Sequence, residues 1–469
     1  MGRIVTDKFK YRHELTKILA SGGQGTVWRT TDPKIAVKIA GNENSTPEEL
    51  RALAEDTRNA LDRLSGLPIP ANIGISIPIA PLEGVPGYSM LLLQGLSSFE
   101  EAFNVRTLAE QIDDAEIPAA FKAWSDETTA KRFAAYNKSG GLRRRLLALA
   151  KCASELSRLN GAGLIYCDVN MNNVLLSDDM NNPVLWLIDP DNIRYDNPNG
   201  GAILFPGFGA PEIYNGETGN TSQGDVWAFA VAAFKLLLLW EHPFEGALMQ
   251  KYEDSDEGET LAYTGEFPYA LDPDDDTNAN FARGVAENIL TPELDALFAL
   301  TFIDGKDRPE LRPPMFVWAE ALAGAADLAV KCPVCGSSYY DADKCVWCDA
   351  ETPPLLTIDT YRLAPDGTRQ NVWRFVHEAA DGAPVMIPKR VLAPFMMTDF
   401  DTEIFTLTRS GSAAVMTRPD ITEDITLESK GGVFRPGFST ELPAESFRVH
   451  ADISGRKVVA EIAYTGGRA

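Results

Sequence analysis

Four cysteines in the last third of the chain constrain the local fold more tightly than any other feature. Cys332 and Cys335 form one C-x2-C pair, Cys345 and Cys348 form a second, and nine residues separate the pairs. Two thiolates from each pair supply the four soft ligands that a tetrahedral zinc ion requires. Two disulfides or four free thiols are the alternative. Because no histidine lies near enough to complete an open catalytic site, the sequence predicts a structural zinc ribbon over residues 330–352.

The overall composition is that of a globular protein without a strongly basic face. A chain of 469 residues with 45% hydrophobic and 23% charged residues is long enough for about two to four domains. Its net charge of −24 argues against nucleic acid or an anionic membrane as a partner. Residues 1–10 are polar and unlike a signal peptide, and the most apolar run, residues 226–240, is too short to span a bilayer. We therefore expect a cytoplasmic protein.

A glycine-rich turn and a lysine mark the first part of the chain. The turn matches G-x-G-x-x-G-x-V with Ala20 in the first glycine position, and it reads Ala20-Ser21-Gly22-Gly23-Gln24-Gly25-Thr26-Val27. Lys38 follows at the end of Ile35-Ala36-Val37-Lys38, in a short strand expected over residues 34–39. A helix expected over residues 48–64 then offers two carboxylates, Glu55 and Glu49, and its apolar stripe does not decide between them.

A second series of motifs occupies the mainly helical residues 98–325. Asp168 is followed five residues later by Asn173, and an apolar strand expected over residues 185–188 leads into Asp189-Pro190-Asp191. The tetrapeptide Gly-Ala-Pro-Glu that ends at Glu212, an apolar helix headed by Asp225, and Arg312 then follow in that order. The acidic residues 250–280 are expected to form an extended loop between helices.

Taken in order, these motifs resemble the eukaryotic-like protein kinase family over roughly residues 11–325. The runs at residues 186–192, 209–212 and 242–244 look like a bacterial branch of that family. Kinases of this branch are associated with von Willebrand A-domain proteins and metal-dependent phosphatases in tellurite-resistance-type phosphorylation triads. The resemblance implies an ATP- and magnesium-dependent protein kinase acting on protein hydroxyls, with serine and threonine favoured over tyrosine and the choice between them left open. It also implies a protein substrate and those two classes of protein as partners.

The resemblance also assigns roles to single residues. Asp168 would orient the substrate hydroxyl and take its proton, while Asn173 and Asp189 would hold magnesium. Lys38 would anchor the ATP phosphates, itself held by Glu55 or Glu49 from the following helix. The other residues expected around ATP are Ser21, Gly22, Gly23, Gln24, Gly25, Val27 and Ala36.

Departures from the family pattern leave a second interpretation open. Tyr166-Cys167 replaces the usual His-Arg before the catalytic Asp, Asn170 replaces a Lys, and Pro190-Asp191 replaces Phe-Gly. The alternative is a catalytically weak, nucleotide-binding scaffold that recruits partners through its zinc ribbon and β module. The four polar residues that the family uses for phosphate, magnesium and proton transfer are all present, which favours the enzyme. They are Lys38, Asp168, Asn173 and Asp189. A small-molecule kinase would share the Asp–Asn spacing, but the Ala-Pro-Glu run and Arg312, the expected partner of Glu212, argue against it.

The expected architecture is α+β, with a bilobal protein-kinase-like fold followed by a small zinc ribbon and an all-β C-terminal module. The N-terminal lobe would span residues 11–95 and the C-terminal lobe residues 96–325. The ribbon would span residues 330–352. Short alternating runs separated by Gly, Pro and Asp indicate the β-rich module over residues 355–469.

Overall fold

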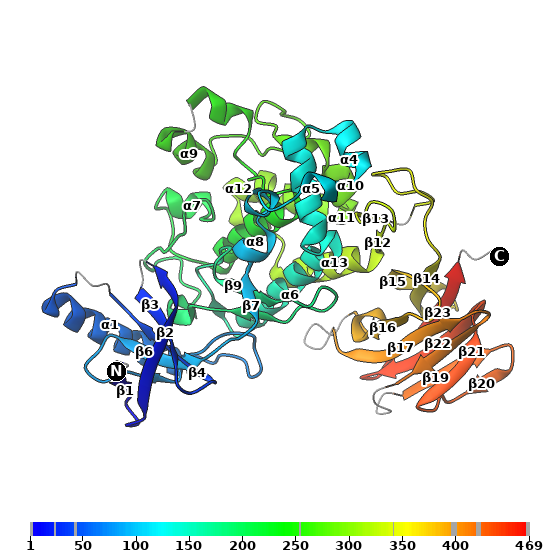
Figure 1. Cartoon of the computed structure of the whole chain (residues 1–469), viewed down its shortest axis with the longest axis horizontal. Coiled ribbons are helices and arrows are strands. Elements are labelled where there is room, and N and C mark those ends of the chain that lie inside the picture. The colour runs from blue at the N-terminus through cyan, green and yellow to red at the C-terminus, as the bar shows by residue number, and fades with distance from the viewer. Residues whose placement is uncertain are drawn as a thin grey trace. The chain divides into compact units, whose positions relative to one another are not determined.

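The computed structural model describes residues 3–22, 25–41, 45–252, 255–340, 342–394, 401–418 and 424–465. It is a mixed α+β structure with several sheets (Figure 1). The chain forms two compact units that alternate along the sequence, and residues 96–325 contribute to both. The first unit comprises Met1–Ala102, Glu155–Asp178 and Val184–Ala232. The second comprises Phe103–Ser154, Asp179–Pro183 and Ala233–Ala469.

An antiparallel six-stranded sheet opens the first unit. Its strands, in spatial order, are β1 (Ile4–Thr6), β2 (Arg12–Gly22), β3 (Gly25–Thr30), β4 (Ile35–Ile39), β6 (Gly87–Leu91) and β5 (Ala80–Pro81). Val37 and Ile39 alternate with Lys38 along β4 and join the apolar cluster on one face of the sheet, so that Lys38 points to the other face.

Helix α1 (Pro47–Ser65) confirms the helix predicted over residues 48–64. Its start is fixed by a capping box, in which the Thr46 hydroxyl accepts the N–H of Glu49 and the Glu49 carboxylate accepts the N–H of Thr46. Pro47 occupies the first turn, where its missing N–H is not needed.

The rest of the first unit contains short strands, loops and helical segments, among them most of α8 (Ser222–Leu237). One small sheet has the order β10 (Leu185–Leu187), β9 (Val174–Ser177) and β7 (Leu96–Ser98). A second pairs β11 (Arg194–Tyr195) with β8 (Leu164–Ile165). The short helix α7 (Pro211–Tyr214) carries the buried Glu212.

Before β12, the second unit is mainly helical and contains α5 (Glu127–Lys138), α11 (Pro292–Ala299) and α13 (Met315–Leu328). It also contains the first part of α6 (Gly141–Gly161), whose residues from Glu155 onward belong to the first unit. The prediction of an extended loop over residues 250–280 is wrong in part, because α9 (Asp256–Tyr263) lies within it. Ser255 caps this helix by accepting the N–H of Gly258, and acidic residues in the first turn complement the helix dipole. Gly258 and Ala262 are the buried residues of this helix.

A small hairpin and a β-sandwich complete the second unit. The hairpin pairs β12 (Ala329–Lys331) with β13 (Ser338–Tyr340). Ten strands then form two sheets, β15-β14-β23-β22-β19-β20 and β16-β17-β18-β21. Their bounds are β14 (Leu355–Leu363), β15 (Arg369–Glu378), β16 (Pro384–Pro388), β17 (Glu403–Ser410), β18 (Ala413–Thr417), β19 (Asp424–Ser429), β20 (Gly432–Phe434), β21 (Ser439–Pro443), β22 (Ser446–Ile453) and β23 (Arg456–Thr465). One buried apolar cluster takes side chains from both sheets.

Buried charges attach this β module to the end of α13. Asp327, only 2% exposed, accepts hydrogen bonds of 2.8 and 2.7 Å from the Arg390 guanidinium. It also accepts a 2.8 Å bond from the indole of Trp373. Arg390 reaches Asp401 at 2.6 Å, and Asp401 in turn pairs with Lys151 of α6 at 2.7 Å. The module is therefore fastened to two helices by a charge network.

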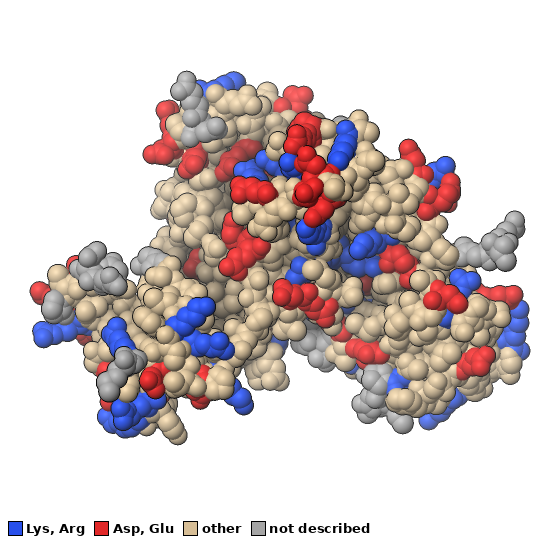
Figure 2. Space-filling model, viewed as in Figure 1, with Lys and Arg blue, Asp and Glu red and all other residues tan. Residues whose placement is uncertain are grey.

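The surface carries both signs of charge. On the face shown in Figure 2, Lys and Arg lie among Asp and Glu, and no extended basic patch is visible among the described residues of that face. Within the described part of the chain, no helix combines the length and apolar character needed to cross a membrane.

Candidate functional site

A cavity of about 740 Å³ lies entirely within the first unit. Its walls come from the β2–β3 hairpin, β4, β6, and the loops around Asp168 and Asp189. This volume lies in the range of ligand sites, roughly 300–1,000 Å³. The predicted site residues that line it are Ser21, Gly25, Val27, Ala36, Lys38, Asp168, Asn173 and Asp189. Gly22 pairs with Gly25 across the hairpin, whereas Gly23 and Gln24 lie outside the described residues.

Gly25 is required by the tight approach of the hairpin to its neighbouring strand. Its φ of +134° is a conformation that residues with a Cβ rarely adopt. A Cβ placed there would lie 2.2 Å from the carbonyl oxygen of Ile39 and 2.9 Å from the Cα of Ala40. The absence of a side chain therefore allows the hairpin to approach the end of β4 closely.

Lys38 enters the cavity from β4, between Val27 of β3 and Tyr88 of β6. Its side chain is 8% exposed, and its Nζ lies 2.7 Å from Oδ1 of Asp189 and 3.8 Å from Oδ2 of Asp191. Buried ammonium groups need such partners. The site therefore holds Lys38 between two carboxylates of one loop.

The expected pairing of Lys38 with a helix glutamate is not what the structure shows. Glu55 is exposed on α1 and does not line the cavity. The Glu49 carboxylate is engaged at the start of its own helix, where the N–H of Thr46 holds its pKa below the usual range. The predicted partners of Lys38 were both residues of the helix. The sequence signal for a different partner was Asp191, the second acidic residue of Asp189-Pro190-Asp191.

Asp168 is oriented by the asparagines that follow it. Asn170 donates from Nδ2 to Oδ1 of Asp168 at 2.9 Å, and Asn173 donates to the Asp168 carbonyl at 3.0 Å. Burial raises the pKa of Asp168, although the bond that Asn170 donates to the carboxylate opposes that rise. A fixed carboxylate with a raised pKa suits a proton acceptor. Asn170 thus has a role that the sequence reading did not assign to it.

The loop before Asp168 is fixed by Asp225 of α8. Its two carboxylate oxygens accept the N–H groups of Tyr166 at 2.7 Å and Cys167 at 2.8 Å, and Cys167 has a φ of +69°. Burial raises the pKa of Asp225 to about 7. The Tyr166 hydroxyl donates to the carbonyl of Ile188, next to Asp189. These bonds tie together the two loops that line the cavity.

The donor set at the cavity suits a hard divalent cation. Asp189 supplies a carboxylate, and the amide nitrogen of Asn173 is used by the Asp168 carbonyl, which leaves its amide oxygen for another partner. Magnesium prefers oxygen ligands of these two kinds. The residues present therefore fit a magnesium ion.

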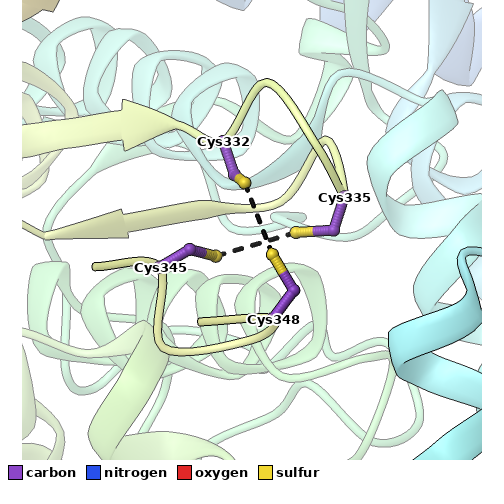
Figure 3. A group of neighbouring side chains, drawn as sticks. All are labelled: Cys332, Cys335, Cys345 and Cys348. Atoms are coloured by element: carbon purple, nitrogen blue, oxygen red, sulfur yellow. Dashed lines mark hydrogen bonds between the residues drawn. The ribbon is translucent and has the colours of Figure 1, made fainter. Parts of the chain in front are cut away.

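The four cysteines form a second, separate cluster (Figure 3). Their sulfur atoms point toward one centre and all lie within 4.8 Å of one another. The Cys332–Cys348 and Cys335–Cys345 sulfur pairs are 3.6 and 3.7 Å apart. A disulfide would need about 2.05 Å, whereas thiolates on a tetrahedral zinc at about 2.3 Å lie roughly 3.8 Å apart. The cluster can therefore hold a structural metal such as zinc.

The predicted pair of Glu212 and Arg312 stays a prediction. Both side chains are buried, and Nε of Arg312 donates to the carbonyl of Gly305 at 2.8 Å.

In comparisons with known proteins, no family model matches the chain, and no curated protein matches it.

Proposed function

We propose that the protein is an ATP- and magnesium-dependent protein kinase with a bilobal fold. The observation that carries this proposal is the convergence of Lys38, Asp168, Asn173 and Asp189 on one cavity of about 740 Å³. Lys38 and Asp189 are 151 residues apart in the sequence and yet form an ion pair. A cation for phosphate, oxygen ligands for magnesium and a proton acceptor are the groups that phosphoryl transfer needs.

Each residue has a defined task in this proposal. The nucleotide would lie under the β2–β3 hairpin with its phosphates at Lys38, and Asp189 and Asn173 would hold magnesium, which neutralises charge on the phosphates when bound. The substrate hydroxyl would donate to Asp168 and attack the γ-phosphorus in line. The bond from that phosphorus to the bridging oxygen breaks, ADP leaves, and the hydroxyl proton passes to Asp168. Catalysis rests on positioning and electrostatics.

In the same proposal, the six-stranded sheet and α1 form the smaller lobe. The four-cysteine ribbon and the β module bind partners, and the resemblance to the bacterial branch makes von Willebrand A-domain proteins and metal-dependent phosphatases the partners to examine first.

A nucleotide-binding scaffold without transfer activity is the second candidate. Two observations favour it: Asn170 stands where many kinases have a Lys, and Lys38 is paired with Asp189, the proposed magnesium ligand. The first removes a positive contact to the transferred phosphoryl. The second means that magnesium must compete with Lys38 for one carboxylate.

The deciding experiment measures transfer of labelled phosphate from MgATP to the protein itself and to mixed Ser, Thr and Tyr peptides. We expect transfer by the wild type and a loss of about 10²-fold or more in Asp168→Asn. Exposed Asp178 provides the matched control Asp178→Asn, which should behave as wild type. Wild-type protein that binds MgATP but transfers nothing would favour the scaffold. Wild-type protein that binds no nucleotide would refute both candidates.

A further inference from the structure

We infer that Asp191, and not a glutamate of α1, is the counterion that positions Lys38 in the nucleotide-bound protein. This inference rests on the proposed function and assigns a positioning residue to the same site. Asp191 stands where the family pattern has a glycine, and a glycine could not supply this charge.

Lys38 and the proposed magnesium ion would compete for Asp189. Its Oδ1 is 2.7 Å from Nζ of Lys38 in this structure, yet the same carboxylate is the proposed magnesium ligand. If the Asp189 carboxylate turned to a magnesium ion, Lys38 would lose its nearest partner. Among the described residues, the other carboxylate in an ion pair with Lys38 is Asp191, whose Oδ2 is 3.8 Å from Nζ.

The loop holds Asp191 where it can replace Asp189 as the partner of Lys38. Pro190 opens the short helix η2 (Pro190–Asn192), which directly follows Asp189 in a left-handed conformation with φ of 53°. A guanidinium nitrogen of Arg63, in the last turn of α1, donates to the Asp191 carbonyl at 2.6 Å. The Tyr88 hydroxyl lies 3.4 Å from Oδ2 of Asp191. Two separate elements therefore fix this residue from its backbone and its side chain.

The carboxylate of Asp191 can also accept a further hydrogen bond. Its Oδ1 is buried and has no hydrogen-bond partner among the described residues. A buried carboxylate oxygen without a donor is unfavourable. A small shift of the Lys38 ammonium toward Asp191 would let it donate to that oxygen. The new hydrogen bond would offset part of the cost of leaving Asp189.

The glutamates of α1 are poorly placed for the same task. Glu49 would have to leave the capping box, which stabilises the start of the helix. Glu55 lies exposed in water. Arg63 instead links α1 to the loop that carries Asp191, so α1 supports Lys38 indirectly through that loop.

The test compares Asp191→Asn, Asp191→Glu and Glu55→Gln with the wild type, using Asp56→Asn on the exposed face of α1 as the matched control. The readouts are MgATP affinity by calorimetry and kcat and KM for ATP in the transfer assay. We expect Asp191→Asn to weaken MgATP binding by about tenfold. Asp191→Glu should recover part of the loss because it keeps the charge.

A double-mutant cycle separates positioning from a merely structural role. In a Lys38→Met background, Asp191→Asn should cause less than about a twofold further loss of MgATP affinity, since its partner is gone. Fully additive losses would overturn the inference, as would a tenfold loss in Glu55→Gln with Asp191→Asn unchanged. Because binding is measured directly, absence of transfer in the wild type would refute the kinase proposal while the cycle still decides the role of Asp191. Circular dichroism of each variant checks that it is folded.

Discussion

Replacing Arg390 with methionine should loosen the attachment of the β module to α13. Methionine keeps much of the apolar stem and removes the guanidinium. Asp327 would then keep the indole of Trp373 as its described hydrogen-bond donor, at 2.8 Å. Asp401 would retain Lys151 at 2.7 Å. The main damage therefore falls on Asp327, which is 2% exposed.

The size of the effect follows from leaving a buried charge without its partner. Removing one member of a buried ion pair costs about 3–5 kcal/mol, and Asp327 loses two hydrogen bonds of 2.8 and 2.7 Å. Replacing both partners by apolar residues is often neutral. The double variant Asp327→Leu/Arg390→Met should therefore recover most of the stability that the single variant loses.

Denaturant unfolding followed by tryptophan fluorescence and circular dichroism measures these differences. Arg374 provides the control, because it forms an ion pair with Asp359 in the same module but both side chains are exposed. The exposed fraction is 43% for Arg374 and 49% for Asp359. Arg374→Met should cost about 1 kcal/mol or less. If Arg390→Met costs no more than Arg374→Met, or if the double variant is less stable than Arg390→Met, the buried pair does not anchor the module.

Three further outcomes are expected. Zinc should co-purify with the chain, as measured by elemental analysis, and fresh reduced protein without zinc would contradict the ribbon. Cys335→Ser should lose the zinc while the β module stays folded. Gly25→Ala should weaken ATP binding in a titration, because the new Cβ meets the Ile39 carbonyl at 2.2 Å, and an unchanged affinity would show that the hairpin does not contact nucleotide. Asn170→Ala removes a bond that lowers the pKa of Asp168, so the pKa should rise further. Since the ionised form accepts the proton, the acid limb of the pH–rate profile should move to higher pH, and an unmoved limb would argue against Asp168 as the base.

Features set by neighbours in the sequence could be predicted. The start of α1 follows from Thr46, Pro47 and Glu49, which cap it within one turn. The metal cluster follows from two C-x2-C pairs, because each pair places its thiolates together whatever the rest of the chain does. The α9 helix was within reach of the same reasoning, since Ser255 and the acidic first turn are a helix start signal.

Features set by distant residues could not be predicted. Whether Lys38 meets Glu55 or Asp191 depends on where α1 and η2 lie against β4, and neither motif encodes that geometry. The charges that fasten the β module could not be predicted either, because nothing in the sequence distinguishes Arg390 from an ordinary basic residue beside a strand. Only the fold shows that it lies against α13.

The separation of Asp327 and Arg390 by 63 residues has a consequence for synthesis. A ribosome adds about 5–20 residues per second, so α13 emerges roughly 3–13 seconds before the residue that pairs with its last turn. During this interval the carboxylate of Asp327 must stay hydrated, and the end of α13 cannot reach its final buried state. The helical part of the second unit should therefore complete its folding only after the first strands of the β module have been translated.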